Sequence, residues 1–186
     1  MPSYDYPFNE RIRTFLRVED LFAKVLHNIE ESHEYQHHSA LLTLLQILDI
    51  VDRLELRSDL MQELSRQRMA MEVLRGNPAI AAKKLDEILN EIDTATDALR
   101  AENSKLGQTL RANEWLMSIK QRAGIPGGVC EFDVPSYHYW LGLGEERRKE
   151  DLKNWLSPLV SMHNAIVIIL RILRGSGSST KLVAPN

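Results

Sequence analysis

The stretch from residue 157 to residue 175 reads SPLVSMHNAIVIILRILRG and contains the most apolar run of the chain. Its start, Ser157-Pro158, reads as a cap followed by proline at the first helical position, and Arg174-Gly175 supplies a cationic last turn and a glycine stop. The run 165–173 is shorter than the ~20 residues that cross a bilayer, and Arg171 interrupts it. We therefore expect a last helix that is buried or lies at an interface, without membrane insertion.

Upstream of this helix, apolar residues repeat with helical spacing, and no alternating pattern typical of strands is present. Asn9 and Asn113 are good N-caps, and Gly76-Asn77-Pro78 stops a helix between them. The expected helices cover about residues 9–31, 39–53, 56–75, 79–100, 105–123 with a break near 113, 145–156 and 158–174. The sequence predicts an all-α fold, an antiparallel helical bundle of about six to seven helices with a helix-breaking loop at residues 124–135.

The domain organisation follows from the same pattern. We expect an N-terminal extended segment at residues 1–8, one helical domain at residues 9–174, and a flexible tail at residues 175–186, where the sequence GSGSSTKLVAPN resembles a linker. A chain of 186 residues is long enough for one domain with a real core.

Composition excludes several classes of protein. The formal net charge is −3, so no global field attracts nucleic acid or acidic lipid. Cys130 is the single cysteine, which excludes an internal disulfide and a cysteine-based zinc site. The first residues, MPSYDYPFNERIR, lack an apolar signal core. The sequence is typical of a cytoplasmic protein that binds no nucleic acid.

Catalytic and metal motifs are weak. His33, His37 and His38 lie in SHEYQHHS, but no HExxH pattern supplies further ligands, and a solvated segment between helices is the alternative that we favour. Cys130 and His138 are close in sequence without a third group to orient them. We therefore expect neither an enzyme nor a cofactor, and we interpret Cys130 as a small apolar filler.

The stretch IPGGVCEFDVPSYHYWL, residues 125–141, interrupts the helical pattern. Its first four residues reverse the chain, Phe132 is a candidate core residue, and Val134-Pro135 restarts a short helical turn. That turn directs Tyr137, His138 and Trp140 to different sides, so at most some of them are core residues.

Paired basic residues are the remaining candidates for a binding site. Arg13 and Arg17 share a face of the first helix, and Arg53 and Arg57 form a second pair. A third group, Arg111, Lys120 and Arg122, precedes the loop. Spacing alone favours solvated faces with local glutamate partners, but paired arginines beside exposed aromatic residues also suit an acidic, partly apolar peptide.

Three segments carry a family resemblance: NERIRTFLRVEDLF near the start, ILDIVDRLELRSDLMQELSRQR in the middle, and QRAGIPGGVCEFDVPSYHYWL later. Their order and spacing resemble the ZapD family of bacterial Z-ring-associated cell division proteins along nearly the whole chain. The resemblance implies a non-enzymatic cytoplasmic adaptor at the mid-cell division site, which binds the C-terminal peptide of FtsZ and, as a homodimer, bundles or cross-links FtsZ filaments.

Carried over to this sequence, the resemblance implies that Arg13, Arg17 and His138 contact the peptide, with Arg53 as a weaker candidate. Glu114 stands where the family pattern leads us to expect an arginine, and nearby Arg111 is a possible substitute. The family also continues into a small β-rich domain that receives a strand from the N-terminus. We expect most of that domain to be absent from these 186 residues, as in a helical-domain fragment.

Two questions stay open at this point. The last helix is apolar on nearly all sides between Ile166 and Leu173, so it either faces a second subunit or is a fully enclosed central helix. The chain itself is either an FtsZ-binding adaptor or a purely structural helical dimerisation module whose arginines only solvate its surface.

Overall fold

The structure is a computed structural model that describes residues 5–7, 9–53, 55–77, 81–102 and 105–176. In this part of the chain every regular element is helical, which confirms the all-α class. The elements are α1 (Glu10–Glu30), α2 (Glu34–Arg53), α3 (Leu56–Val73), α4 (Ala82–Ala101), α5 (Gln108–Arg111), α6 (Glu114–Ala123), α7 (Pro135–Leu141), α8 (Glu145–Leu156), the 3-10 turn η1 (Ser157–Leu159) and α9 (Val160–Ser176). The described helices outnumber the expected six to seven because α5 and α7 are short helices of their own. The expected segments 1–8 and 175–186 lie largely outside the described residues.

Local signals set several of these boundaries. The side chain of Asn9 accepts a hydrogen bond from the amide of Ile12 at 2.8 Å, and Asn113 accepts from Leu116 at 3.1 Å, which confirms both N-caps. Gly107 precedes α5 with φ of 71°, and a Cβ there would lie 2.6 Å from Cδ1 of Leu48. Only glycine fits both this backbone conformation and the close approach of α5 to α2.

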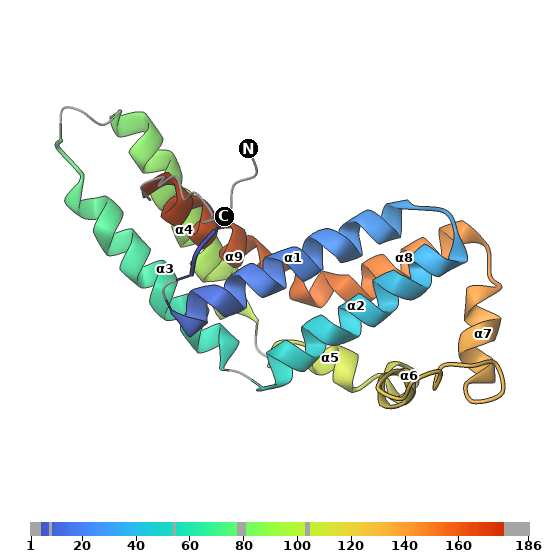
Figure 1. The fold of residues 1–186 in the computed structure, drawn as a ribbon. Helices are drawn as coiled ribbons and strands as arrows, with labels where there is room; N and C mark the ends of the chain where they lie inside the picture. The colour runs from blue at the N-terminus through green and yellow to red at the C-terminus, as the bar shows by residue number, and fades with distance from the viewer. Residues whose placement is uncertain (1–4, 8, 54, 78–80, 103–104, 177–186) are drawn as a thin grey trace, which may run out of the picture.

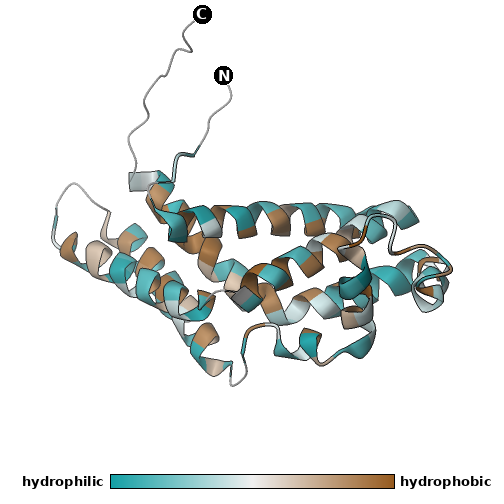
Figure 2. Cartoon of the chain, turned by 60° about the horizontal axis from the view of Figure 1, so that its bottom comes forward, coloured by the Kyte–Doolittle hydropathy of each residue, from teal (hydrophilic) through white to brown (hydrophobic). Residues whose placement is uncertain are grey.

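The helices form two halves joined by one long rod, which consists of α8, η1 and α9 in succession. α1 and α2 make an antiparallel hairpin along which α8 packs, and α3 and α4 make a second hairpin that packs on α9 (Figure 1). Apolar and polar segments alternate along the helices, as expected for amphipathic helices that share a core (Figure 2). Because α1 also contacts α9, the core is continuous between the two halves.

The rod corrects the expectation for Ser157-Pro158. The backbone of Ser157 stays helical (φ −53°, ψ −39°), and its hydroxyl donates to the carbonyl of Asn154 at 2.9 Å instead of capping a new helix. Pro158 needs no amide partner in the 3-10 turn, so α8 continues through η1 into α9. The two predicted helices therefore act as one element that reaches both hairpins.

α9 supplies the centre of the core. Its buried side chains are Met162, Ala165, Ile166, Ile169, Leu170 and Ile172, and they meet α1, α3 and α4. Among the described residues, the rod is also long and apolar enough to cross a membrane by length and composition. Its packing against three helices accounts for that composition, as expected for a core helix.

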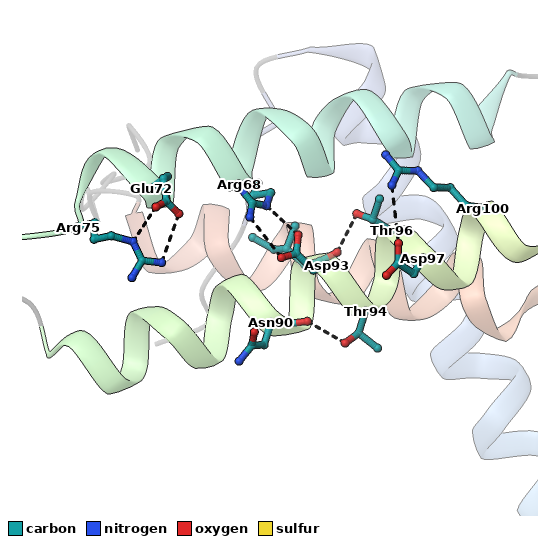
Figure 3. A network of polar contacts seen from close by, with 10 residues as sticks. Arg68, Glu72, Arg75, Asn90, Asp93, Thr94, Thr96, Asp97 and Arg100 are labelled. Atoms are coloured by element: carbon teal, nitrogen blue, oxygen red, sulfur yellow. Dashed lines mark hydrogen bonds and ion pairs between the residues drawn. The ribbon is translucent and has the colours of Figure 1, made fainter.

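Ion pairs join neighbouring helices at their surfaces. Arg68 of α3 donates to Asp93 of α4 at 2.7 Å (Figure 3), and Arg75 binds Asp86 at 2.9 Å. Arg174, at the end of α9, binds Asp5 at 2.7 Å and Glu19 of α1 at 2.6 Å. Exposed pairs of this kind contribute about 0.2–1 kcal/mol each, so they orient the helices more than they stabilise them.

The loop before α7 confirms one expectation and corrects another. α7 begins at Pro135, so the predicted restart is right, and Gly127 supplies the left-handed turn with φ of 73°. Phe132, the candidate core residue, is 83% exposed. Val134, just before α7, and Tyr137 and Trp140 on α7 are the buried residues at this end instead. Tyr137 contacts His38 of α2, and Trp140 contacts Trp115 of α6.

Truncation of one core residue tests the role of α9. Ile169 is fully buried, so Ile169→Ala removes packed methyl groups and leaves a cavity. We expect the free energy of unfolding to fall by about 2–5 kcal/mol, measured by urea denaturation. Ile125, which is 51% exposed, provides a matched control, and Ile125→Ala should change the free energy by less than about 1 kcal/mol. Equal effects of the two variants would contradict this account of the core.

Candidate functional site

The outward face of α1 carries the basic residues singled out from the sequence. Arg13 forms an ion pair with Glu10 at 2.8 Å, and Lys24 forms one with Asp20 at 2.6 Å. Arg17 lies between these pairs and is exposed, and its side chain has no ion pair or hydrogen bond to any described residue. A carboxylate that approaches α1 would therefore find one uncommitted guanidinium, flanked by Arg13 in an exposed and easily exchanged pair.

Arg11 lies on a neighbouring side of the same helix and has a structural task. It binds Asp59 at 2.9 Å and donates to the side-chain oxygen of Gln62 at 3.0 Å, both on α3. This contact fixes the first turns of α1 against the second hairpin. The position of Arg13 and Arg17 is thus set by packing and not by a flexible end.

Arg111 is committed to the fold. Its guanidinium pairs with Asp52 of α2 and donates to the carbonyl of Leu106 at 2.7 Å. Lys120 of α6 also reaches Asp52 and Asp49, each at 2.9 Å. Burial raises the pKa of Asp52, but the hydrogen bonds from Lys120 and Arg111 outweigh burial and hold this pKa below its usual range. Arg111 therefore anchors α5 to α2 and has little capacity left for a ligand.

Of the two remaining positions named from the sequence, the structure describes the side chain of Glu114 but not that of Arg53. Arg53 is the last residue of α2, and its side chain lies outside the described residues. Glu114 is exposed in the first turn of α6, where a negative charge is favourable beside the free amides of the helix start. The unexpected glutamate thus has a local structural reason.

His138 holds the loop onto α7. Its Nε2 lies 3.0 Å from the carbonyl oxygen of Val129, and its half-buried ring meets the edge of Tyr137 with ring centroids 5.8 Å apart. Cys130 is partly exposed, so it is not the apolar filler that the sequence predicts, and it donates from Sγ to the carbonyl of Gly127 at 2.5 Å. Both side chains therefore shape the loop.

The structure does not bring all the predicted residues together. Arg13 and Arg17 lie in the first turns of α1, beside α3 and the end of α9, whereas α7 lies at the opposite end of the α1–α2 hairpin (Figure 1). The contact between His38 of α2 and Tyr137 fixes α7 at that far end. Within one chain, the predicted site separates into an α1 region and an α7 region.

A cluster of aromatic rings at the α7 end was not anticipated from the sequence. Trp115, Trp140 and Trp155 come from α6, α7 and α8, and their ring centroids lie 5.3–5.9 Å apart. Tyr137 stacks on Trp140 at 6.0 Å. The indole N–H groups of Trp115 and Trp140 donate to Ser136 and Asp151, each at 3.1 Å. These interactions dock α7 on its neighbours, which the sequence distances between the tryptophans did not reveal.

The histidine segment also differs from expectation. Residues 35–38 belong to α2 and not to a solvated connection, and His37 is fully buried. In the part of the chain that the structure describes, no three histidine, cysteine or acidic side chains are placed to hold a metal ion. His37 serves the fold instead.

Its partner is Arg148 of α8, which is only 6% exposed. The guanidinium donates to four acceptors from separate parts of the chain: Nδ1 of His37 at 2.8 Å, the carbonyls of Ser32 at 3.1 Å and Leu141 at 3.0 Å, and the carbonyl of Leu143. Because Nδ1 accepts a hydrogen bond, the neutral ring carries its proton on Nε2, which faces the carbonyl of Ile29 at 3.4 Å. Burial first and the charge of Arg148 second lower the pKa of His37.

Comparison with known proteins gives a consistent result along the chain. A family model described as "ZapD: Cell division protein" matches residues 16–186. The curated "Cell division protein ZapD" of Dechloromonas aromatica is 48% identical over 186 residues, which is all of this chain and 74% of that protein. The proteins of the same name from Ralstonia nicotianae and Aromatoleum aromaticum are 50% and 49% identical and cover 99% and 98% of this chain, and 73% and 71% of their own length.

Acidification tests the contact between His37 and Arg148. The folded pKa of His37 lies below its ordinary value of 6.5, so the unfolded chain binds more protons between the two values. The contribution of neutral His37 to the free energy of unfolding is fully present above about pH 6.5, and it is lost as the pH falls through the pKa of the folded state. The pKa values of His38 and His163 are lowered as well, chiefly by burial, and act in the same direction.

We therefore expect the free energy of unfolding, measured by urea denaturation, to decrease as the pH is lowered from about 7 to about 5. His37→Gln keeps an acceptor for Arg148 without titrating and should reduce this dependence on pH. His33→Gln, at an exposed position, is the control and should leave it unchanged. An identical pH dependence in all three proteins would rule out His37 as a contributor.

Proposed function

This chain belongs to the ZapD family of cell division proteins, and we propose that it acts as a non-enzymatic adaptor that binds the C-terminal peptide of FtsZ. In this proposal the protein works in the cytoplasm at the mid-cell division site. As a homodimer it presents two peptide sites and so bundles or cross-links FtsZ filaments. Two linked sites hold two filaments by avidity even when each contact is weak.

The observation that supports a peptide site on α1 is the uncommitted guanidinium of Arg17. The chain as a whole is negative, so attraction for an acidic peptide has to come from a local group. Arg17 is exposed, and the packing of α1 holds it beside Arg13 on one face. A guanidinium binds carboxylate oxygens through paired N–H donors, which suits an acidic peptide segment.

The other predicted contacts have a lower rank in this proposal. His138 and Arg111 already donate to or face groups of their own chain, Val129 and Asp52. A peptide that used them would have to replace those contacts. We therefore assign the primary contact to Arg17, the second to Arg13, and only supporting contacts to His138, Arg53 and Arg111.

The second candidate is a structural helical dimerisation module that binds no peptide itself. The observation that favours it is the commitment of most arginines to partners within the chain, such as Arg11, Arg68 and Arg174. The two candidates make opposite predictions for isolated peptide binding by this chain.

Charge reversal at Arg17 separates them. We expect the labelled C-terminal peptide of FtsZ to bind the chain in a fluorescence anisotropy titration, and Arg17→Glu to weaken binding by about tenfold or more because it places like charges together. Binding should also weaken as salt is raised, since exposed charges are screened.

Arg100→Glu is a matched control because Arg100 is an exposed arginine on α4, outside the α1 face, and already pairs with Asp97. It should bind the peptide as the unchanged protein does. If Arg17→Glu binds as well as Arg100→Glu, the assignment of the site is wrong. If none of the three proteins binds, the dimerisation module is the better description.

A further inference from the structure

Three cations lie in line along one side of α1. Arg13 and Arg17 are four residues apart, and Lys24 follows Arg17 after seven residues, so each spacing returns close to the same side of the helix. At a rise of about 1.5 Å per residue, the three residues span roughly 16 Å along the helix axis. The cationic face around Arg17 is therefore a stripe about three turns long, which we call the α1 stripe, and Lys24 is its last member.

The two outer cations of the α1 stripe are paired with carboxylates of the same helix. Glu10 binds Arg13 at 2.8 Å, and Asp20 binds Lys24 at 2.6 Å. The side chain of Arg17 has no such partner among the described residues. The stripe therefore offers one open cation between two cations that are already paired.

Both of these ion pairs are exposed to solvent. The side chains of Asp20 and Lys24 are 62% and 58% exposed, and that of Glu10 is 76% exposed. Water screens such pairs, and holding two long side chains in one geometry costs entropy, so each internal carboxylate is bound only weakly. A carboxylate of a ligand can replace it, most readily when another carboxylate of the same ligand is already bound to Arg17.

The two internal carboxylates are not equivalent. Glu10 is the first residue of α1, where a negative charge is favourable beside the free amides of the helix start. Asp20 lies in the middle of the same helix, beyond the reach of this effect. Replacing the charge of Asp20 therefore disturbs the helix less, which makes Asp20 the better position for an experiment.

We propose that the α1 stripe is a site for a peptide with several carboxylates, and that Glu10 and Asp20 are internal competitors that this peptide displaces from Arg13 and Lys24. The inference rests on the proposed function and extends its peptide site by Lys24 and the two carboxylates. An extended chain rises about 3.3 Å per residue, so a segment of about six residues with an acidic side chain at each end and one between spans the stripe. A ligand with a single carboxylate gains only the contact with Arg17.

Neutralisation of Asp20 tests the competition. The probe is a labelled peptide of serine and glutamate with three glutamates at this spacing, titrated by fluorescence anisotropy. We expect Asp20→Asn to tighten binding by about two- to fivefold because Lys24 is released from its partner, and Lys24→Gln to weaken binding by a similar factor. The gain from Asp20→Asn should be much smaller in the Lys24→Gln background, since both substitutions act on the same ion pair.

Asp97→Asn is the matched control because Asp97 is an exposed carboxylate on α4 that pairs with Arg100, outside the α1 stripe. It removes the same charge and should leave binding unchanged. Equal gains from Asp20→Asn and Asp97→Asn would show that net charge alone acts, and would overturn the inference. An undiminished gain in the Lys24→Gln background would also overturn it, because repulsion by Asp20 would then be sufficient. A gain of affinity cannot result from a variant that fails to fold.

Two comparisons separate this inference from the proposed function. Tighter binding of the serine–glutamate probe by Asp20→Asn, without any binding of the FtsZ peptide, would support the α1 stripe and contradict the proposed function. Binding of the FtsZ peptide that depends on Arg17 but responds to neither Asp20→Asn nor Lys24→Gln would support the proposed function and contradict the inference. A probe with three glutamates that binds no more tightly than one with a single glutamate would also contradict the inference.

Discussion

The fold depends on covering one apolar helix. α9 presents buried side chains to α1, α3 and α4, and such a helix is stable in water only when neighbours cover most of its circumference. Because α9 continues from the charged α8 through η1, the same rod also runs beside the α1–α2 hairpin. The two hairpins are therefore fixed relative to each other. This arrangement also sets the position of the first turns of α1, which carry Arg17.

Much of this fold is readable from local sequence. Asn9 and Asn113 cap helices as expected, and the glycine-rich loop before Pro135 ends one helix and allows another to begin. The wrong predictions concern residues whose burial or helical continuity depends on partners that are distant in sequence. Ser157-Pro158 looks like a helix start, yet the packing of one rod against two hairpins keeps it continuous. Phe132 looks like core, yet it is exposed, and Tyr137 and Trp140 of α7 are the buried aromatic residues that follow it.

The candidate site shows the same limit more sharply. Spacing on α1 is enough to place Arg13 and Arg17 on one face, because helical periodicity is local. Spacing does not reveal which arginine is already paired, and Arg111 turns out to bind Asp52, which is 59 residues away in sequence. The same holds for His37, whose role rests on Arg148, 111 residues away. Whether a charged side chain is already paired depends on tertiary contacts. Only the structure therefore distinguishes the unpaired side chain of Arg17 from the paired arginines near it.

The tryptophan cluster has a practical consequence. All three tryptophans of the chain lie on α6, α7 and α8, so the α3–α4 hairpin contains none. Intrinsic fluorescence therefore reports the environment of one end of the molecule, whereas circular dichroism in the far ultraviolet averages over every helix. Coincident transitions in the two signals would mean that the rod makes both halves unfold as one cooperative unit, and separate transitions would identify the end that loosens first.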